Sequence, residues 1–154
     1  MPEILYKKPT LLDIPAMQTL VAPEIESGVI LPRSNDEIAT NIRSYFLAME
    51  GEKLVGFVAL HIHSPQLAEL RSMIIDQNYR GKNIGSMLVA KACEEGSALG
   101  LKEVLALTYQ QRFFERLGFV EIPKESIPEH KIWADCIKCK HFPVCNEVSL
   151  IKTL

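Results

Sequence analysis

The sequence has little of what marks several classes of protein. It carries 17 Lys and Arg against 19 Asp and Glu, a net charge of −2, so no basic surface for nucleic acid is indicated. The longest apolar run, 54–60, is far shorter than the ~20 residues that cross a bilayer. The first ten residues contain no apolar signal-peptide core, and the chain has only four Cys. We therefore expect a cytoplasmic protein with reduced thiols and no nucleic-acid or membrane partner.

Length and composition are those of a single globular domain. The chain has 154 residues, of which 47% are hydrophobic, and domains cluster around ~100–150 residues. No repeat, low-complexity run or linker divides it. We expect one domain over 1–154, with an irregular, cysteine-containing segment at about 123–147. The sequence leaves the oligomeric state open, a homodimer included.

Changes of hydrophobic period predict the order of strands and helices. Asp13 with Pro15 indicates one helix start, and the capping box from Ser34 to Glu37 indicates a second. Strands are predicted at 4–7, 45–49, 54–63, 67–76, 101–108, 119–122 and 148–152, and later helices at 84–99 and 112–117. Because strands and helices alternate around two hairpins, we predict an α/β domain with a mixed sheet.

The segment 79–86 (YRGKNIGS) carries the clearest chemical signal. It lies between a predicted strand and a long helix, where unpaired backbone N–H groups and the partial positive charge of the helix start favour a pyrophosphate. Glycines let the backbone approach the phosphates, while cations and a hydroxyl add contacts. The predicted binding residues are Arg80, Gly81, Lys82, Asn83, Ile84, Gly85 and Ser86. A tight turn entering a surface helix is the alternative.

This segment resembles the acetyl-CoA signature of the GNAT superfamily of N-acetyltransferases. The signature is Arg/Gln-x-x-Gly-x-Gly/Ala, with Arg80, Asn83 and Gly85 at its defining positions. Asn83 replaces the usual first glycine, and Asn tolerates left-handed backbone angles. Residues 113–119 (FFERLGF) resemble the second cofactor-side motif and place Phe114 beside the cofactor. The resemblance covers about residues 2–122. It implies acetyl-CoA as donor and a mostly antiparallel sheet, flanked by helices and splayed between its fourth and fifth strands.

A narrower resemblance is to the acetyltransferase domain of bacterial N-acetylglutamate synthase, in its short, single-domain form. It is carried by 28–34 (GVILPRS), 67–81 and the FFERLGF block. The resemblance implies that the acceptor is the α-amine of an amino acid such as glutamate, as in arginine biosynthesis, and that Arg33 helps to hold it. Arg71 is a second candidate, since a guanidinium binds carboxylate bidentately, and a surface salt bridge is its alternative role. The family's tail motif does not map here.

The superfamily resemblance also assigns residues to the transfer step. A bulge in the fourth strand leaves backbone N–H groups facing the thioester, and Met73, Ile74 and Ile75 occupy that place. Glu69, upstream on the strand, would take the ammonium proton directly or through water, and a solvent-facing strand Glu is the alternative. Phe114 stands where many relatives have a Tyr, so Tyr109 is the candidate proton donor, unless the thiolate leaves to water. His61 and His63 share a strand face, where a polar surface is the ordinary case.

The last segment contains the ligand types of a zinc site. Cys136, Cys139, His141 and Cys145 would make a Cys3His set. Only one such cluster exists, and a domain of this size folds without metal, so we predict thiols rather than zinc, with Cys93 in the core.

Two other functions remain open at this point. One is a GNAT enzyme for another amine, such as a polyamine, a drug or a peptide N-terminus. The other is a non-catalytic acyl-CoA-binding module, which a thiol-release assay would distinguish.

Overall fold

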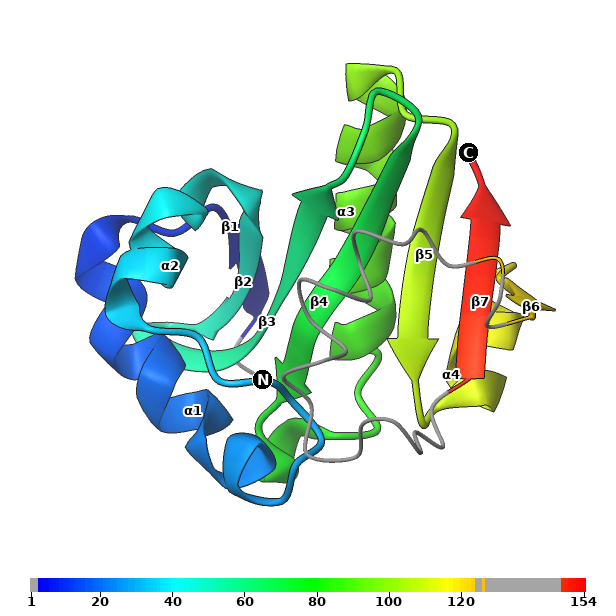
Figure 1. Cartoon of the computed structure of the whole chain (residues 1–154). Helices are drawn as coiled ribbons and strands as arrows, with labels where there is room; N and C mark the ends of the chain where they lie inside the picture. The colour runs from blue at the N-terminus through cyan, green and yellow to red at the C-terminus, as the bar shows by residue number, and fades with distance from the viewer. Residues whose placement is uncertain (1–2, 124–125, 127–147) are drawn as a thin grey trace.

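The computed structural model describes residues 3–123, 126 and 148–154, and their strands form one seven-stranded sheet in the order β1-β2-β3-β4-β5-β7-β6 (Figure 1). The strands are β1 Ile4–Lys7, β2 Tyr45–Glu50, β3 Lys53–Ile62, β4 Leu67–Ile75, β5 Glu103–Thr108, β6 Val120–Ile122 and β7 Val148–Thr153. The α-helices are α1 Ile14–Glu26, α2 Asn35–Thr40, α3 Ile84–Leu99 and α4 Gln111–Arg116. The predicted elements are confirmed, with bounds that agree to within a residue or two.

The ends of α2 and α3 are set by capping residues. At α2 the predicted capping box is present, because the Ser34 hydroxyl accepts from the Glu37 N–H at 3.1 Å and the Glu37 carboxylate faces the Ser34 N–H. Helix α3 is bounded by two left-handed residues, Asn83 with φ 63° and Gly100 with φ 92°. The tolerance of Asn for this conformation is therefore used at position 83.

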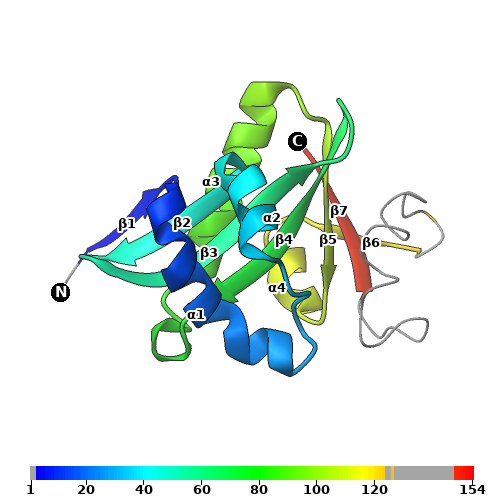
Figure 2. The same ribbon diagram turned by 60° about the vertical axis from the view of Figure 1, so that its left-hand side comes forward.

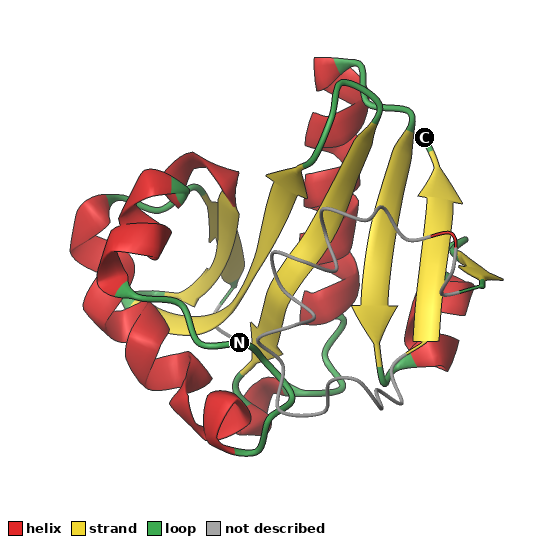
Figure 3. Ribbon diagram, viewed as in Figure 1, coloured by secondary structure: helices red, strands yellow, loops and turns green. Residues whose placement is uncertain are grey.

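Helices cover both faces of the sheet (Figures 2 and 3). Helix α3 packs against one face, and α1 and α2 pack against the other. Alternation along β3 sends Val58 and Leu60 into the cluster under α3, and sends Phe57 and Ala59 into the cluster under α1 and α2. The sheet thus separates two hydrophobic layers. Among the described residues, no helix combines the length and the apolar composition that a membrane span requires.

The centre of the sheet opens at a β-bulge in β4. Phe57 pairs with Ile74 and Ala59 with Arg71, so that Val58 faces two residues, Ser72 and Met73. Ser72 adopts φ 55°, which is left-handed. The parallel ladder between β4 and β5 joins only 67–70 to 103–106, and beyond it the two strands diverge (Figure 1). The predicted splay between the fourth and fifth strands is confirmed.

Candidate active site

The site lies at the open ends of β4 and β5, where α3 and α4 begin (Figure 1). Residues 76–83 connect β4 to α3 and are anchored on the sheet, because the Asp76 N–H donates to the Val55 carbonyl at 2.7 Å. The Tyr79 N–H then donates to the Asp76 carbonyl at 2.8 Å, which closes the turn. The Asn83 side chain makes no capping hydrogen bond to α3. The first turn of this 16-residue helix therefore presents backbone N–H groups that can donate hydrogen bonds to a phosphate.

Gly85 lies in a tightly packed contact as well as at the suggested access to phosphate. A Cβ built on Gly85 would lie 3.2 Å from Cζ of Phe113 and 3.9 Å from Cγ1 of Ile75. The glycine thus lets the first turn of α4 lie against the first turn of α3. Gly81, with φ 79° and no atom within 4 Å of such a Cβ, is instead required by its backbone conformation.

The cations of the loop are held at its surface. Arg80 Nη2 lies 3.3 Å from a carboxylate oxygen of Glu24 on α1, and Arg80 Nε donates to the Ile75 carbonyl at 3.3 Å. Lys82 Nζ stands 5.2 Å from the centroid of the Tyr79 ring. The Tyr79 hydroxyl donates to the Glu50 carboxylate at 2.8 Å, and this hydrogen bond is the main cause that raises the pKa of Tyr79. Arg80 therefore stands on the α1 side of the loop, while Lys82 lies beside Tyr79, whose hydroxyl reaches β2.

Glu69 is the centre of a buried polar cluster. Its side chain is 3% exposed, as is that of His63, whose Nε2 lies 2.9 Å from Glu69 Oε1. The same oxygen accepts from Arg71 Nε at 3.2 Å. Leu70 packs under α3, so Glu69 and Arg71 project from the face of the sheet that α1 and α2 cover. The solvent-facing alternative for Glu69 is wrong, and so is the expectation of a polar-surface position for His63.

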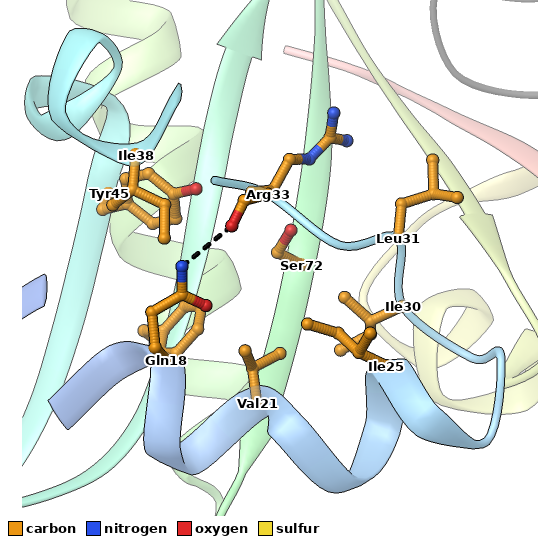
Figure 4. A pocket seen from close by; sticks show the side chains of 10 residues that line it. Gln18, Val21, Ile25, Ile30, Leu31, Arg33, Ile38, Tyr45 and Ser72 are labelled. Carbon is orange, nitrogen blue, oxygen red and sulfur yellow. Dashed lines mark hydrogen bonds between the residues drawn. The ribbon is translucent and has the colours of Figure 1, made fainter. Parts of the chain in front are cut away.

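A pocket on this face lies between α1, the segment before α2 and strands β2 to β4 (Figure 4). Its lining residues are Gln18, Val21, Ile25, Ile30, Leu31, Arg33, Ile38, Tyr45, Phe57 and Ser72. Most of this wall is apolar, and its polar groups are few, which is the usual character of a small-molecule site. Ser72 belongs to the bulge, so the pocket reaches the point where the central strands part.

The segment that carries Arg33 is fixed by α1. The Gln18 side-chain amide donates to the Arg33 carbonyl at 2.8 Å and to the Asn35 side-chain oxygen at 3.0 Å. The guanidinium of Arg33 extends away from the apolar wall in Figure 4 and lies 3.9 Å from the Glu37 carboxylate. Burial raises the pKa of Tyr45, while the charges of Arg33 and Arg71 oppose that shift. Both predicted substrate arginines therefore act electrostatically on one buried tyrosine, which the sequence had not singled out.

The remaining predicted residues differ in their accessibility. Ile74 is buried, whereas Met73 and Ile75 are half-buried at the bulged end of β4. Phe114 is 4% exposed and packs edge-on against Phe113 and Phe119, with ring centroids 4.9 and 5.2 Å away, so it belongs to the core beneath the site. Tyr109 follows β5 and is 40% exposed. Phe113 is the ring that lies nearest to Gly85 in the first turn of α3.

Metal ligands do not gather in the part of the chain that the structure describes, where no group of three or more His, Cys, Asp or Glu could hold an ion. The candidate set Cys136, Cys139, His141 and Cys145 lies outside the described residues. Cys93 is a buried free thiol on α3, as predicted, and burial raises its pKa.

The bulge stores backbone strain that substitution should reveal. A left-handed conformation costs a residue with a Cβ roughly 1–2 kcal/mol, and most of all a β-branched one. We expect Ser72→Gly to raise the free energy of unfolding by about 1 kcal/mol and Ser72→Val to lower it by about 1–3 kcal/mol. Urea unfolding of the two variants measures this. Equal stabilities for the Gly and Val variants would contradict a strained position 72.

Fold and site together define an α/β domain of the acetyltransferase type. Residues 14–119 match the Acetyltransferase (GNAT) family, and the chain belongs to it. An uncharacterized N-acetyltransferase of Chlorobaculum tepidum is 37% identical over 144 residues, which cover 94% of this chain and 92% of that protein. An amino-acid acetyltransferase of Mycobacterium tuberculosis is 32% identical over 114 residues, 71% of this chain and 64% of the relative.

The fold is also that of a solved synthase. The structure of N-acetylglutamate synthase from Neisseria gonorrhoeae, complexed with coenzyme A and N-acetyl-glutamate, superposes with a TM-score of 0.86 at 20% identity. The match covers 100% of this chain and 36% of that one. The resemblance inferred from the sequence is thus confirmed at the level of family and fold: the protein is a GNAT N-acetyltransferase, a class whose acyl donor is acetyl-CoA.

Proposed function

We propose that the protein transfers the acetyl group of acetyl-CoA to the α-amine of an amino acid, with glutamate as the acceptor. The observation that carries the proposal is an apolar pocket lined by Arg33, Tyr45 and the bulge residue Ser72, next to which Arg71 contacts the buried Glu69 carboxylate on β4. Two guanidinium groups suit an acceptor with carboxylates. Among the described residues that line the pocket there is no carboxylate, which disfavours a polyamine.

The donor would bind along the opening between β4 and β5. In this proposal the pyrophosphate lies at the start of α3. Backbone N–H groups of residues 80–86, which include the first turn of the helix, donate hydrogen bonds to it. Arg80 would exchange its contact with Glu24, which is partly exposed, for the phosphate. The pantetheine arm would then run toward the bulge, where β4 has no ladder partner in β5. This brings the thioester to the edge of the pocket at Ser72.

The transfer step then uses groups on β4 and β5. Glu69 takes the proton of the bound ammonium group, and the neutral amine attacks the thioester carbon. Backbone N–H groups of 73–75 stabilise the negative oxygen of the tetrahedral intermediate. Collapse of this intermediate forms the amide and breaks the C–S bond. The departing thiolate takes a proton from Tyr109 or from water.

The test is release of CoA thiol from acetyl-CoA in the presence of single amines at equal concentration. The panel contains glutamate, glutamine, aspartate, leucine, arginine and spermidine. We expect glutamate to exceed spermidine in kcat/KM by more than about tenfold, which corresponds to ~1.4 kcal/mol in transition-state binding. A tenfold advantage of spermidine would overturn the acceptor assignment and leave the family intact. Binding of acetyl-CoA without thiol release from any amine would favour a non-catalytic module.

A further inference from the structure

Tyr45 is a pocket residue whose position is fixed by packing. It opens β2 and is only 5% exposed. Its ring packs edge-on against Phe57, with centroids 5.8 Å apart and planes at 70°. This contact sets the direction of the phenol, and in Figure 4 its hydroxyl points toward the segment that carries Arg33. An aromatic ring held on its apolar side thus presents its polar end to the pocket.

The electrostatic surroundings of this hydroxyl suit an anion. Positive charge acts on it from two elements, Arg33 before α2 and Arg71 on β4. Glu37 adds a smaller opposing influence, and burial is the dominant one, so the pKa of Tyr45 is raised and the phenol keeps its proton at neutral pH. A protonated phenol near guanidinium groups can donate to a carboxylate, whereas it could not neutralise an amine.

Tyr45 lines the pocket, and its hydroxyl is the polar end of a ring that packs against Phe57. A ligand oxygen in this pocket can accept a hydrogen bond from the Tyr45 hydroxyl. Ser72 lines the same pocket and supplies a second hydroxyl at the bulge. The apolar residues around them, such as Val21 and Ile38, would exclude water and strengthen a hydrogen bond formed there.

We infer that Tyr45 determines acceptor specificity: its hydroxyl donates a hydrogen bond to a carboxylate of the acceptor and, with Arg33, selects amino acids over amines that lack a carboxylate. The inference rests on the proposed function and names a group for which sequence patterns gave no signal. Because a hydrogen bond to a charged group is strong, its removal should weaken recognition about 10-fold to 100-fold.

The test replaces Tyr45 by Phe, which keeps the ring and its contact with Phe57. We expect kcat/KM for glutamate to fall about 10-fold to 100-fold through a higher KM. With n-butylamine, which has no carboxylate, kcat/KM should stay at the wild-type value. The affinity for CoA and the thermal unfolding temperature should not change. Tyr6→Phe, on the edge strand β1, is the matched control and should behave as wild type.

Several results would overturn the inference. One is an unchanged KM for glutamate in Tyr45→Phe. Another is an equal loss of activity toward glutamate and n-butylamine, which would mean that the substitution disturbs the site as a whole. If the wild-type protein releases no thiol with any amine, the proposed function fails, and calorimetric binding of glutamate to the CoA complex decides the role of Tyr45 on its own. Equal glutamate affinity in the wild type and Tyr45→Phe would then overturn it.

Discussion

Glu69→Gln is expected to lower turnover by about 10²–10⁴-fold while the affinity for acetyl-CoA stays constant, because a general base contributes rate acceleration of this size. Gln keeps the size of the side chain and removes the proton acceptor. The loss should shrink as the pH rises, because a growing fraction of the amine is then already neutral and needs no base. Steady-state thiol release between pH 7 and pH 9.5, with glutamate as acceptor, measures both effects.

The control for this prediction comes from the same buried cluster. Glu69→Gln also removes the negative charge that faces Arg71 and His63, and the loss of one partner from a buried ion pair can cost about 3–5 kcal/mol of stability. His63→Gln breaks the 2.9 Å contact but keeps the carboxylate, so it should lose less than about tenfold in turnover. The assays are run under conditions in which both variants are folded. Wild-type turnover in Glu69→Gln at neutral pH would remove Glu69 from the mechanism.

Gly85→Val is expected to weaken the binding of acetyl-CoA by about 100-fold or more. The bulky side chain would enter the first turn of α3 and block about two hydrogen bonds to phosphate, each of roughly 1.5–3 kcal/mol. The structure adds a second consequence, because the new Cβ also meets the Phe113 ring at 3.2 Å. Stability should therefore fall together with affinity, and calorimetric titration with acetyl-CoA is combined with thermal unfolding.

A variant at the other end of α3 separates the two effects. Gly96→Ala places a Cβ 3.0 Å from Cδ1 of Leu154, so it strains the same helix away from the loop. We expect it to lose stability and to keep the wild-type affinity for acetyl-CoA. Folded Gly85→Val with unchanged affinity would show that the phosphates bind elsewhere. Equal losses of affinity in both variants would assign the effect to the helix as a whole.

Local sequence chemistry was sufficient to predict the limits of most elements. The capping box at Ser34 starts α2, and Asn83 and Gly100 bound α3, because each acts through its own backbone or through residues three or four away. Family resemblance, rather than residue pattern, predicted the bulge and the splay. Nothing in the types of Ser72 and Met73 shows that they share one partner, Val58, across the sheet.

The parts of the site that the sequence did not reveal depend on pairing between strands. Glu69 pairs with His61 across the hairpin, and this register brings His63 within hydrogen-bond distance. The register of the β3–β4 hairpin alone is enough to predict that contact. The pocket position of Tyr45 could not be found in this way, since it depends on how α1 and the segment before α2 fold over the sheet. Gly85 likewise has a partner, Phe113, that is close only in the folded chain.

Most of the pocket residues precede β3 in the sequence, whereas the proposed donor loop follows β4, and this separation has an evolutionary consequence. Eight of the ten residues that line the pocket lie between Gln18 and Tyr45, and only Phe57 and Ser72 follow them in the sequence. The loop that we propose for the phosphates begins after β4. A gene can therefore accumulate changes in its first third, apart from Glu24, which contacts Arg80, and so alter which amine is accepted while the donor loop keeps its contacts. Recombination within the turn between β2 and β3 would exchange most of one recognition surface as a block.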